Sequence, residues 1–214
     1  MRKMAGCLVC ALMLMGCQTD FVADQPTVKE KKVLAQEKLA QTARQVIQGW
    51  LKKKEYSFQL ELMSGKRRFT GKQVADNWSL KDAASQKLVM RRNGEHIYAY
   101  HDSGTEMMTV KQAGLVSPRD HLSFVLSVAG KFRQGTAEWV NGRRVDVIEV
   151  DIDNGKLLDK LKQALFSNET VRLPVNMAVT YKLAVQDARQ LTKVTLIIRE
   201  PDRGQVQQLT YQLM

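Results

Sequence analysis

The chain has 214 residues, of which 44% are hydrophobic, and it carries a formal net charge of +11. A basic balance of this size suits nucleic acid, an anionic membrane or an anionic polymer as a partner. Nucleic acid is excluded as the expected partner, because no motif of nucleic-acid recognition occurs and the N-terminus reads as an export signal.

The N-terminus has the pattern of a secretory signal. Arg2 and Lys3 precede an apolar run over residues 5–15, which is too short to span about 30 Å of hydrocarbon. The run ends in Leu14-Met15-Gly16-Cys17, which resembles a bacterial lipobox. Met15 departs from the Ala or Ser usual at that position. We expect residues 1–16 to be a signal peptide.

Cleavage at the lipobox would make Cys17 the first residue and the site of lipid attachment, carrying diacylglycerol. A diacyl anchor holds a protein stably on a membrane. The expected location is the cell envelope. It would be the outer face of the plasma membrane, or the periplasmic side of an outer membrane if the organism has two. Residues 17–27 are the lipidated cysteine and its tether, and the ten residues after Cys17 reach at most about 36 Å.

All three cysteines lie within or at the end of the signal. Cys7 and Cys10 form a C-x-x-C pattern, typical of redox or metal sites, but they would be discarded with the signal peptide. We therefore predict no disulfide, thiol nucleophile or thiolate metal site. About 198 residues remain, enough for a core without cross-links.

Much of the positive charge is concentrated directly after the tether. Between Lys29 and Lys54, eight basic and two acidic residues supply +6 of the +9 that the chain keeps without its signal. An anchored protein would bring this segment near anionic lipid headgroups. The alternative is a solvated helix face with no partner.

Residues 28–54 predict one long helix, because Leu39, Val46 and Trp50 belong to an apolar stripe with helical spacing. We expect the stripe to pack in the core. Alternation of apolar and polar residues then predicts strands. They cover residues 58–62, 67–75, 87–91, 95–101 and 105–110.

A second, apolar helix is predicted to begin at Ser117, with Pro118 at its first position and Asp120 near its positive end, and to stop at Gly130. Asn141-Gly142 predicts a tight hairpin turn. The remaining predicted elements are strands at residues 136–140 and 143–151, a helix at 156–166, and strands at 175–185, 190–199 and 205–213.

Together these elements predict an α+β fold. About nine strands form a curved, mostly antiparallel sheet, covered by the long N-terminal helix and two inserted helices. No second domain boundary is visible, so residues 28–214 form a single domain.

No catalytic constellation, cofactor motif or metal site is predicted. His96 and His101 are five residues apart on one strand and point to opposite faces, while His121 lies on another element. We therefore expect a non-enzymatic protein without a cofactor.

The order of elements resembles the LolA-like lipoproteins, which include lipoprotein carriers and the mycobacterial LppX/LprG lipid-binding proteins. The features that carry the resemblance are the lipobox, the helix after it, Gly71 and Trp78 at strand positions, the strand Gly94-Glu95-His96-Ile97-Tyr98, and a helix with Ser117-Pro118 and Leu122. The resemblance implies an incomplete β-barrel whose helices close over an apolar cavity.

The candidate lining of that cavity is apolar and comes from the first helix, the first strand and the second helix. It comprises Trp50, Phe58, Leu60, Leu62, Phe124 and Leu126. The first hypothesis is therefore a lipid-anchored protein that binds or carries a lipid or another apolar ligand. The alternative is a structural, sensor or accessory lipoprotein with a packed core, whose partner is another envelope protein.

Overall fold

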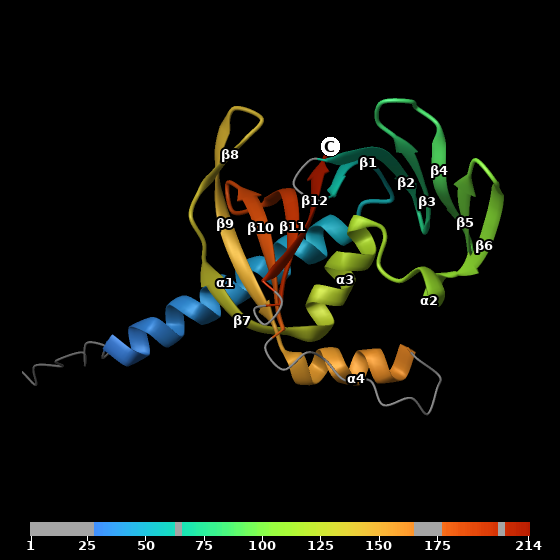
Figure 1. The fold of residues 1–214 in the computed structure, drawn as a ribbon. Helices are drawn as coiled ribbons and strands as arrows, with labels where there is room; N and C mark the ends of the chain where they lie inside the picture. The colour runs from blue at the N-terminus through green and yellow to red at the C-terminus, as the bar shows by residue number, and fades with distance from the viewer. Residues whose placement is uncertain (1–27, 63–65, 165–176, 201–203) are drawn as a thin grey trace, which may run out of the picture.

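The structure is a computed structural model that describes residues 28–62, 66–164, 177–200 and 204–214. Its centre is an open, curved antiparallel sheet of twelve strands, with helices on the concave face (Figure 1). The sheet does not close into a barrel. The predicted fold class is confirmed.

Four helices and twelve strands are described, against three helices and about nine strands predicted. They are α1 (Val28–Leu51), β1 (Glu55–Leu62), β2 (Arg67–Val74), β3 (Asn77–Asp82), β4 (Leu88–Asn93), β5 (His96–His101), β6 (Gly104–Thr109), α2 (Val110–Ala113), α3 (Pro118–Val128), β7 (Ala129–Gln134), β8 (Glu138–Val140), β9 (Arg143–Ile152), α4 (Asn154–Ala164), β10 (Ala178–Gln186), β11 (Gln190–Glu200) and β12 (Gln205–Leu213).

The strand order is β6-β5-β4-β3-β2-β1-β12-β11-β10-β9-β7, and β8 pairs only with β9. The pairing of β1 with the last strand, β12, joins the two halves of the chain. Its register sets Phe58 opposite Leu213, Leu60 opposite Tyr211 and Leu62 opposite Leu209. One continuous concave face results.

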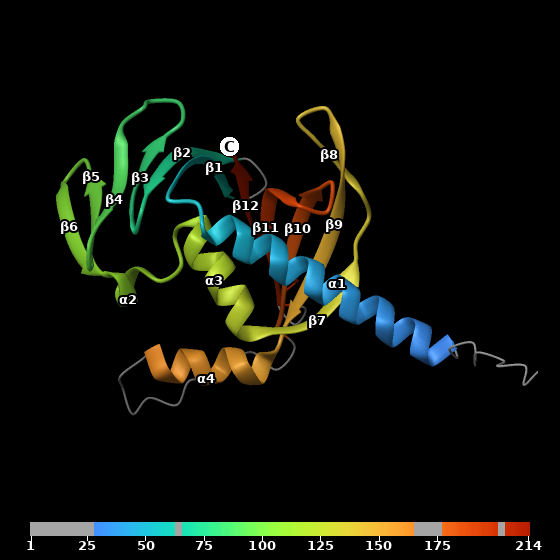
Figure 2. The same cartoon turned by 180° about the vertical axis from the view of Figure 1, so that it is seen from behind.

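Helix α1 packs on this face only through its second half. Ala43, Val46 and Trp50 of the predicted apolar stripe are buried, and so is Ile47. The side chains of residues 33–38 are all exposed. The first half of α1 therefore projects past the β9 end of the sheet (Figure 2).

Helix α3 begins as predicted. The Ser117 hydroxyl accepts a hydrogen bond from the Asp120 amide, the Asp120 carboxylate accepts one from the Ser117 amide, and Pro118 occupies the first turn. The predicted end at Gly130 is wrong, because the helix stops at Val128 and the chain enters β7 directly. Pairing with β9 and burial of Phe132 outweigh the weak local strand signal there.

Strands β3 and β7 were not among those predicted from alternation. β3 is short and bounded by turns, yet Trp78 and Leu80 alternate with polar residues and are buried on the concave face. The predicted Asn141-Gly142 turn is present, with positive φ at both residues. Gly94, which follows Asn93, also has positive φ.

Gly71 is required on β2 because Phe58 lies across it from β1. A Cβ at residue 71 would stand 2.1 Å from the Phe58 ring. The ring also contacts Tyr211 edge-on at 5.8 Å between centroids, so it has little freedom to move away.

Gly71→Ala is expected to lower the free energy of unfolding by about 1–3 kcal/mol through overpacking. Urea denaturation measures the change. In a Phe58→Leu background the same substitution should cost clearly less, because the clashing ring is gone. An equal cost in both backgrounds would contradict this packing account.

Candidate functional site

Two adjoining apolar pockets lie on the concave face. The larger has a volume of about 730 Å³ and is lined by Leu62, Leu196, Ile198 and Leu209, with polar residues of β12 at its edge. The smaller, about 400 Å³, also includes Leu62 and Leu209. The two pockets therefore meet at this pair of leucines, and each has the size of a small-molecule site.

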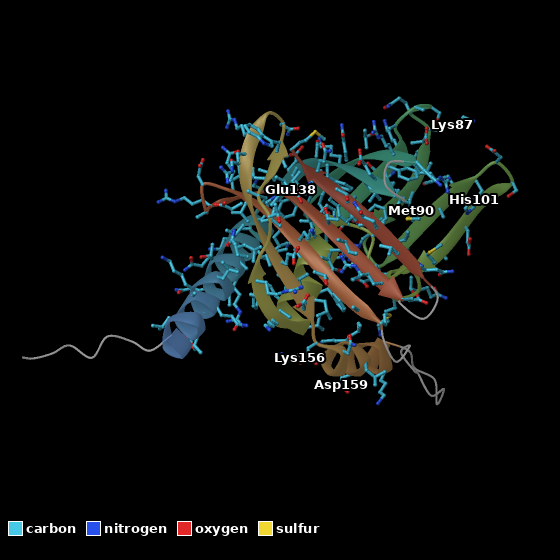
Figure 3. All side chains as sticks on the ribbon, turned by 60° about the vertical axis from the view of Figure 1, so that its left-hand side comes forward. Lys87, Met90, His101, Glu138, Lys156 and Asp159 are labelled. Atoms are coloured by element: carbon cyan, nitrogen blue, oxygen red, sulfur yellow. The ribbon has the colours of Figure 1, made fainter. Side chains whose placement is uncertain are left out.

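The smaller pocket extends from β1 and β12 across β2–β5 to the segment before α3. Figure 3 shows Met90 and His101, two of its lining residues, on the β4–β6 arm of the sheet. The apolar side chains that line it are Leu60, Leu62, Phe69, Leu80, Val89, Met90, Ala99, Leu115, Val116 and Leu209.

The pockets mark where the helix cover ends. Leu60, Tyr211 and Val194 form one row across β1, β12 and β11, and all three are at most 4% exposed. The next row on the same face consists of Leu62, Leu209 and Leu196, which are only half-buried. The open row is thus apolar surface that the helices leave uncovered.

The residues predicted to line a cavity are distributed over three environments. Leu60 and Leu62 line the pockets. Trp50 and Phe58 are buried in the core, where the Trp50 and Tyr56 rings are tilted by 58° with their centroids 4.1 Å apart. Phe124 and Leu126 are half-buried on α3, pack against the core and are not among the lining residues of these two pockets.

Sequence reasoning missed the larger contribution of β11 and β12. Leu196, Ile198 and Leu209 lie on strands that were predicted correctly, and their alternation was visible. The pairing of β12 with β1, about 150 residues earlier in the sequence, determines which face of these strands is concave. Local periodicity does not contain that information.

The pocket rim is basic. Lys66 lines the larger pocket and its neighbour Arg67 lines the smaller one. Both side chains are exposed, and the Arg67 guanidinium carbon lies 5.8 Å from the Phe69 ring centroid. A ligand with an anionic end would find its charge matched here.

A buried polar cluster fixes the segment that closes the smaller pocket. The Tyr211 hydroxyl donates to the Val116 carbonyl at 2.5 Å, and the Tyr181 hydroxyl lies 2.8 Å from His121 Nδ1. Burial raises the pKa of both tyrosines and lowers the pKa of His121 to about 4. The cluster is therefore neutral and serves to hold Leu115 and Val116 in place.

Within the described ranges, no group of three or more His, Cys, Asp or Glu side chains is placed to hold a metal ion. None of the helices in the described part of the chain is long and apolar enough to cross a membrane. Residues 1–27, which include the predicted signal, Cys17 and the tether, lie outside the described residues.

Comparison with solved structures finds lipoproteins of the kind that the sequence resembles. LppX from Mycobacterium tuberculosis is 11% identical, with 83% of this chain and 94% of that chain covered and a TM-score of 0.49. LprF from Mycobacterium bovis is 9% identical, with 83% and 92% covered and a TM-score of 0.48.

A third similar structure is a putative outer membrane lipoprotein-sorting protein domain from Vibrio parahaemolyticus. It is 10% identical, with 84% of this chain and 90% of that chain covered and a TM-score of 0.32. No protein-family model and no curated protein sequence matches this chain. At such low identity, none of these similarities assigns a role to a residue.

The buried His121 predicts a loss of stability on acidification. Its pKa is about 4 in the folded state and about 6.5 when unfolded, so the unfolded state binds the proton first as pH falls. The contribution of His121 to the free energy of unfolding is fully present above pH 6.5 and is lost as pH falls toward 4. At pH 4.5 the free energy of unfolding should be about 2–3 kcal/mol lower than above pH 6.5.

Urea unfolding at pH 7 and pH 4.5 tests this expectation. In the His121→Gln variant, most of the His121-linked decrease in the free energy of unfolding between pH 7 and pH 4.5 should disappear. The control variant His96→Gln changes an exposed residue and should retain that decrease. The account is wrong if both variants keep the same pH dependence as the unsubstituted protein.

Proposed function

We propose that this chain is a lipid-anchored envelope lipoprotein that binds or carries a lipid or another apolar ligand on the concave face of its sheet. The observation that supports this most directly is the open row Leu62–Leu209–Leu196 between two adjoining apolar pockets. Each methylene moved from water into such a pocket contributes about 0.8 kcal/mol.

The proposed protein is not an enzyme. Of the titratable groups that line the pockets, Lys66, Arg67 and His101 are exposed. The buried Tyr211 uses its hydroxyl to hold the Val116 carbonyl and does not point to a reacting atom. Ligand binding needs no such group. The apolar surface and the basic rim suffice for it.

Filling the shared part of the two pockets tests ligand binding. Leu209→Trp adds bulk where both pockets meet, so it should exclude roughly two methylenes of an acyl chain and weaken binding about tenfold. Titration of a dansyl-labelled fatty acid measures the affinity, and thermal unfolding confirms that the variant is folded.

Met107→Trp is the matched control, since it adds a similar side chain at a position that is 61% exposed on β6. It should bind the probe like the unsubstituted protein. No probe uptake by the unsubstituted protein, together with no copurified lipid in native mass spectrometry, would favour the alternative of an accessory lipoprotein with a protein partner.

Cys17→Ser tests the anchor separately. The serine hydroxyl cannot form the thioether to diacylglycerol, so the variant should lose the mass of the acyl groups and move from the membrane fraction to the soluble fraction. Mass spectrometry of the N-terminal peptide and cell fractionation measure both effects. An unchanged N-terminal mass would contradict lipidation at Cys17.

A further inference from the structure

The chain contains three tryptophans, and they differ sharply in exposure. Trp50 and Trp78 are 4% and 3% exposed, whereas Trp139 on β8 is 74% exposed. Burying a tryptophan removes a large apolar surface from water, so the exposed Trp139 is available for a contact.

Trp139 is held outward by its neighbours. Side chains alternate between the two faces of a strand, and both flanking residues of β8 face the sheet. Val140 packs with Val145 and Ala184 in a small buried cluster, and the Glu138 carboxylate forms an ion pair with Lys193. The hairpin is therefore fastened to the sheet on one side and presents Trp139 on the other.

The same hairpin carries positive charge beside the indole. In the pairing of β8 with β9, Arg144 lies opposite Trp139 and Arg143 lies opposite Val140. Both arginines are exposed. No ion pair to either is found among the described residues, although Asp146 lies two residues beyond Arg144. The Asn141-Gly142 turn between the strands is uncharged.

The hairpin and the start of the described chain both lie on the β9 side of the sheet. In Figure 1 the hairpin tip is at the top, whereas α1 begins at the lower left. Figures 1 and 2 show that the hairpin reaches beyond the neighbouring β10–β11 turn and that the projecting half of α1 leaves the body at this β9 end, away from β6. The exposed Val33 and Leu34 lie on that half of α1. The chain toward Cys17 continues from it.

We propose that the β8–β9 hairpin is a second membrane contact, in which Trp139 enters the headgroup region of an anionic leaflet and Arg144, on the same face, contacts lipid phosphate. Arg143 adds positive charge beside the turn. Tryptophan is enriched at this depth because its ring is apolar and its N–H is polar. Arginine forms bidentate hydrogen bonds to phosphate. Charge complementarity selects an anionic membrane over a neutral protein groove as the occupant.

This inference rests on the proposed membrane attachment and is independent of the proposed ligand pocket. The test uses the lipidated chain on vesicles of phosphatidylcholine, with or without one quarter phosphatidylglycerol, in which part of the phosphatidylcholine is brominated. Bromine quenches tryptophan emission at short range. On the anionic vesicles, Trp139 should be quenched and its emission should shift to shorter wavelength.

Trp139→Phe retains only Trp50 and Trp78, so it measures the background quenching, including any that arises from brominated lipid in the pocket. The quenching above this background should be absent in the variant. Arg143→Gln with Arg144→Gln should lower the quenching on anionic vesicles to its level on neutral ones. Met107→Ser, which removes an exposed apolar side chain at the β6 end, should leave it unchanged.

Two results would overturn the inference, and they are distinguishable. In the first, the protein cosediments with the vesicles, but Trp139 stays unquenched and accessible to acrylamide. This result would support the anchor, contradict the membrane contact and indicate a protein partner for the hairpin. Protein that fails to cosediment would reject the attachment and the contact together.

Discussion

The architecture depends on the antiparallel pairing of β1 with β12. This ladder connects the meander β1–β6 to the strands β9–β12 and sets their registers relative to each other. Because side chains alternate between faces, a slip of one residue would turn Leu60 and Leu62 to the convex side. The buried row of Leu60, Tyr211 and Val194 and the open row beside it therefore form only in the observed register.

The helices determine how much of the concave face becomes core. Arg119 at the start of α3 donates to the Leu51 carbonyl at the end of α1 at 3.1 Å, which joins the two covering helices where α1 terminates. His121 and Tyr211 then fasten the start of α3 to the sheet. The cover stops there, and apolar surface beyond it remains open.

Local sequence predicted much of the fold and less of the site. Features that depend on neighbouring residues in the chain could be predicted. They include the helix start at Ser117, the Asn141-Gly142 turn and the period-two pattern of β11. The extension of the chain past Val128 into β7 depends on pairing with β9, and the exposure of Leu196 depends on where the helix cover stops. Such tertiary effects have no local signature. Trp50 and Phe58, which were predicted to line a cavity, are apolar and central but belong to the buried core.

The registers also place the hairpin and the larger pocket at opposite ends of the same strands. Gln190 begins β11 beside the end of β10, near the hairpin, whereas Ile198 lines the pocket. Eight residues of extended strand separate them by roughly 26 Å. If the hairpin rests on the membrane, the larger pocket faces away from that membrane.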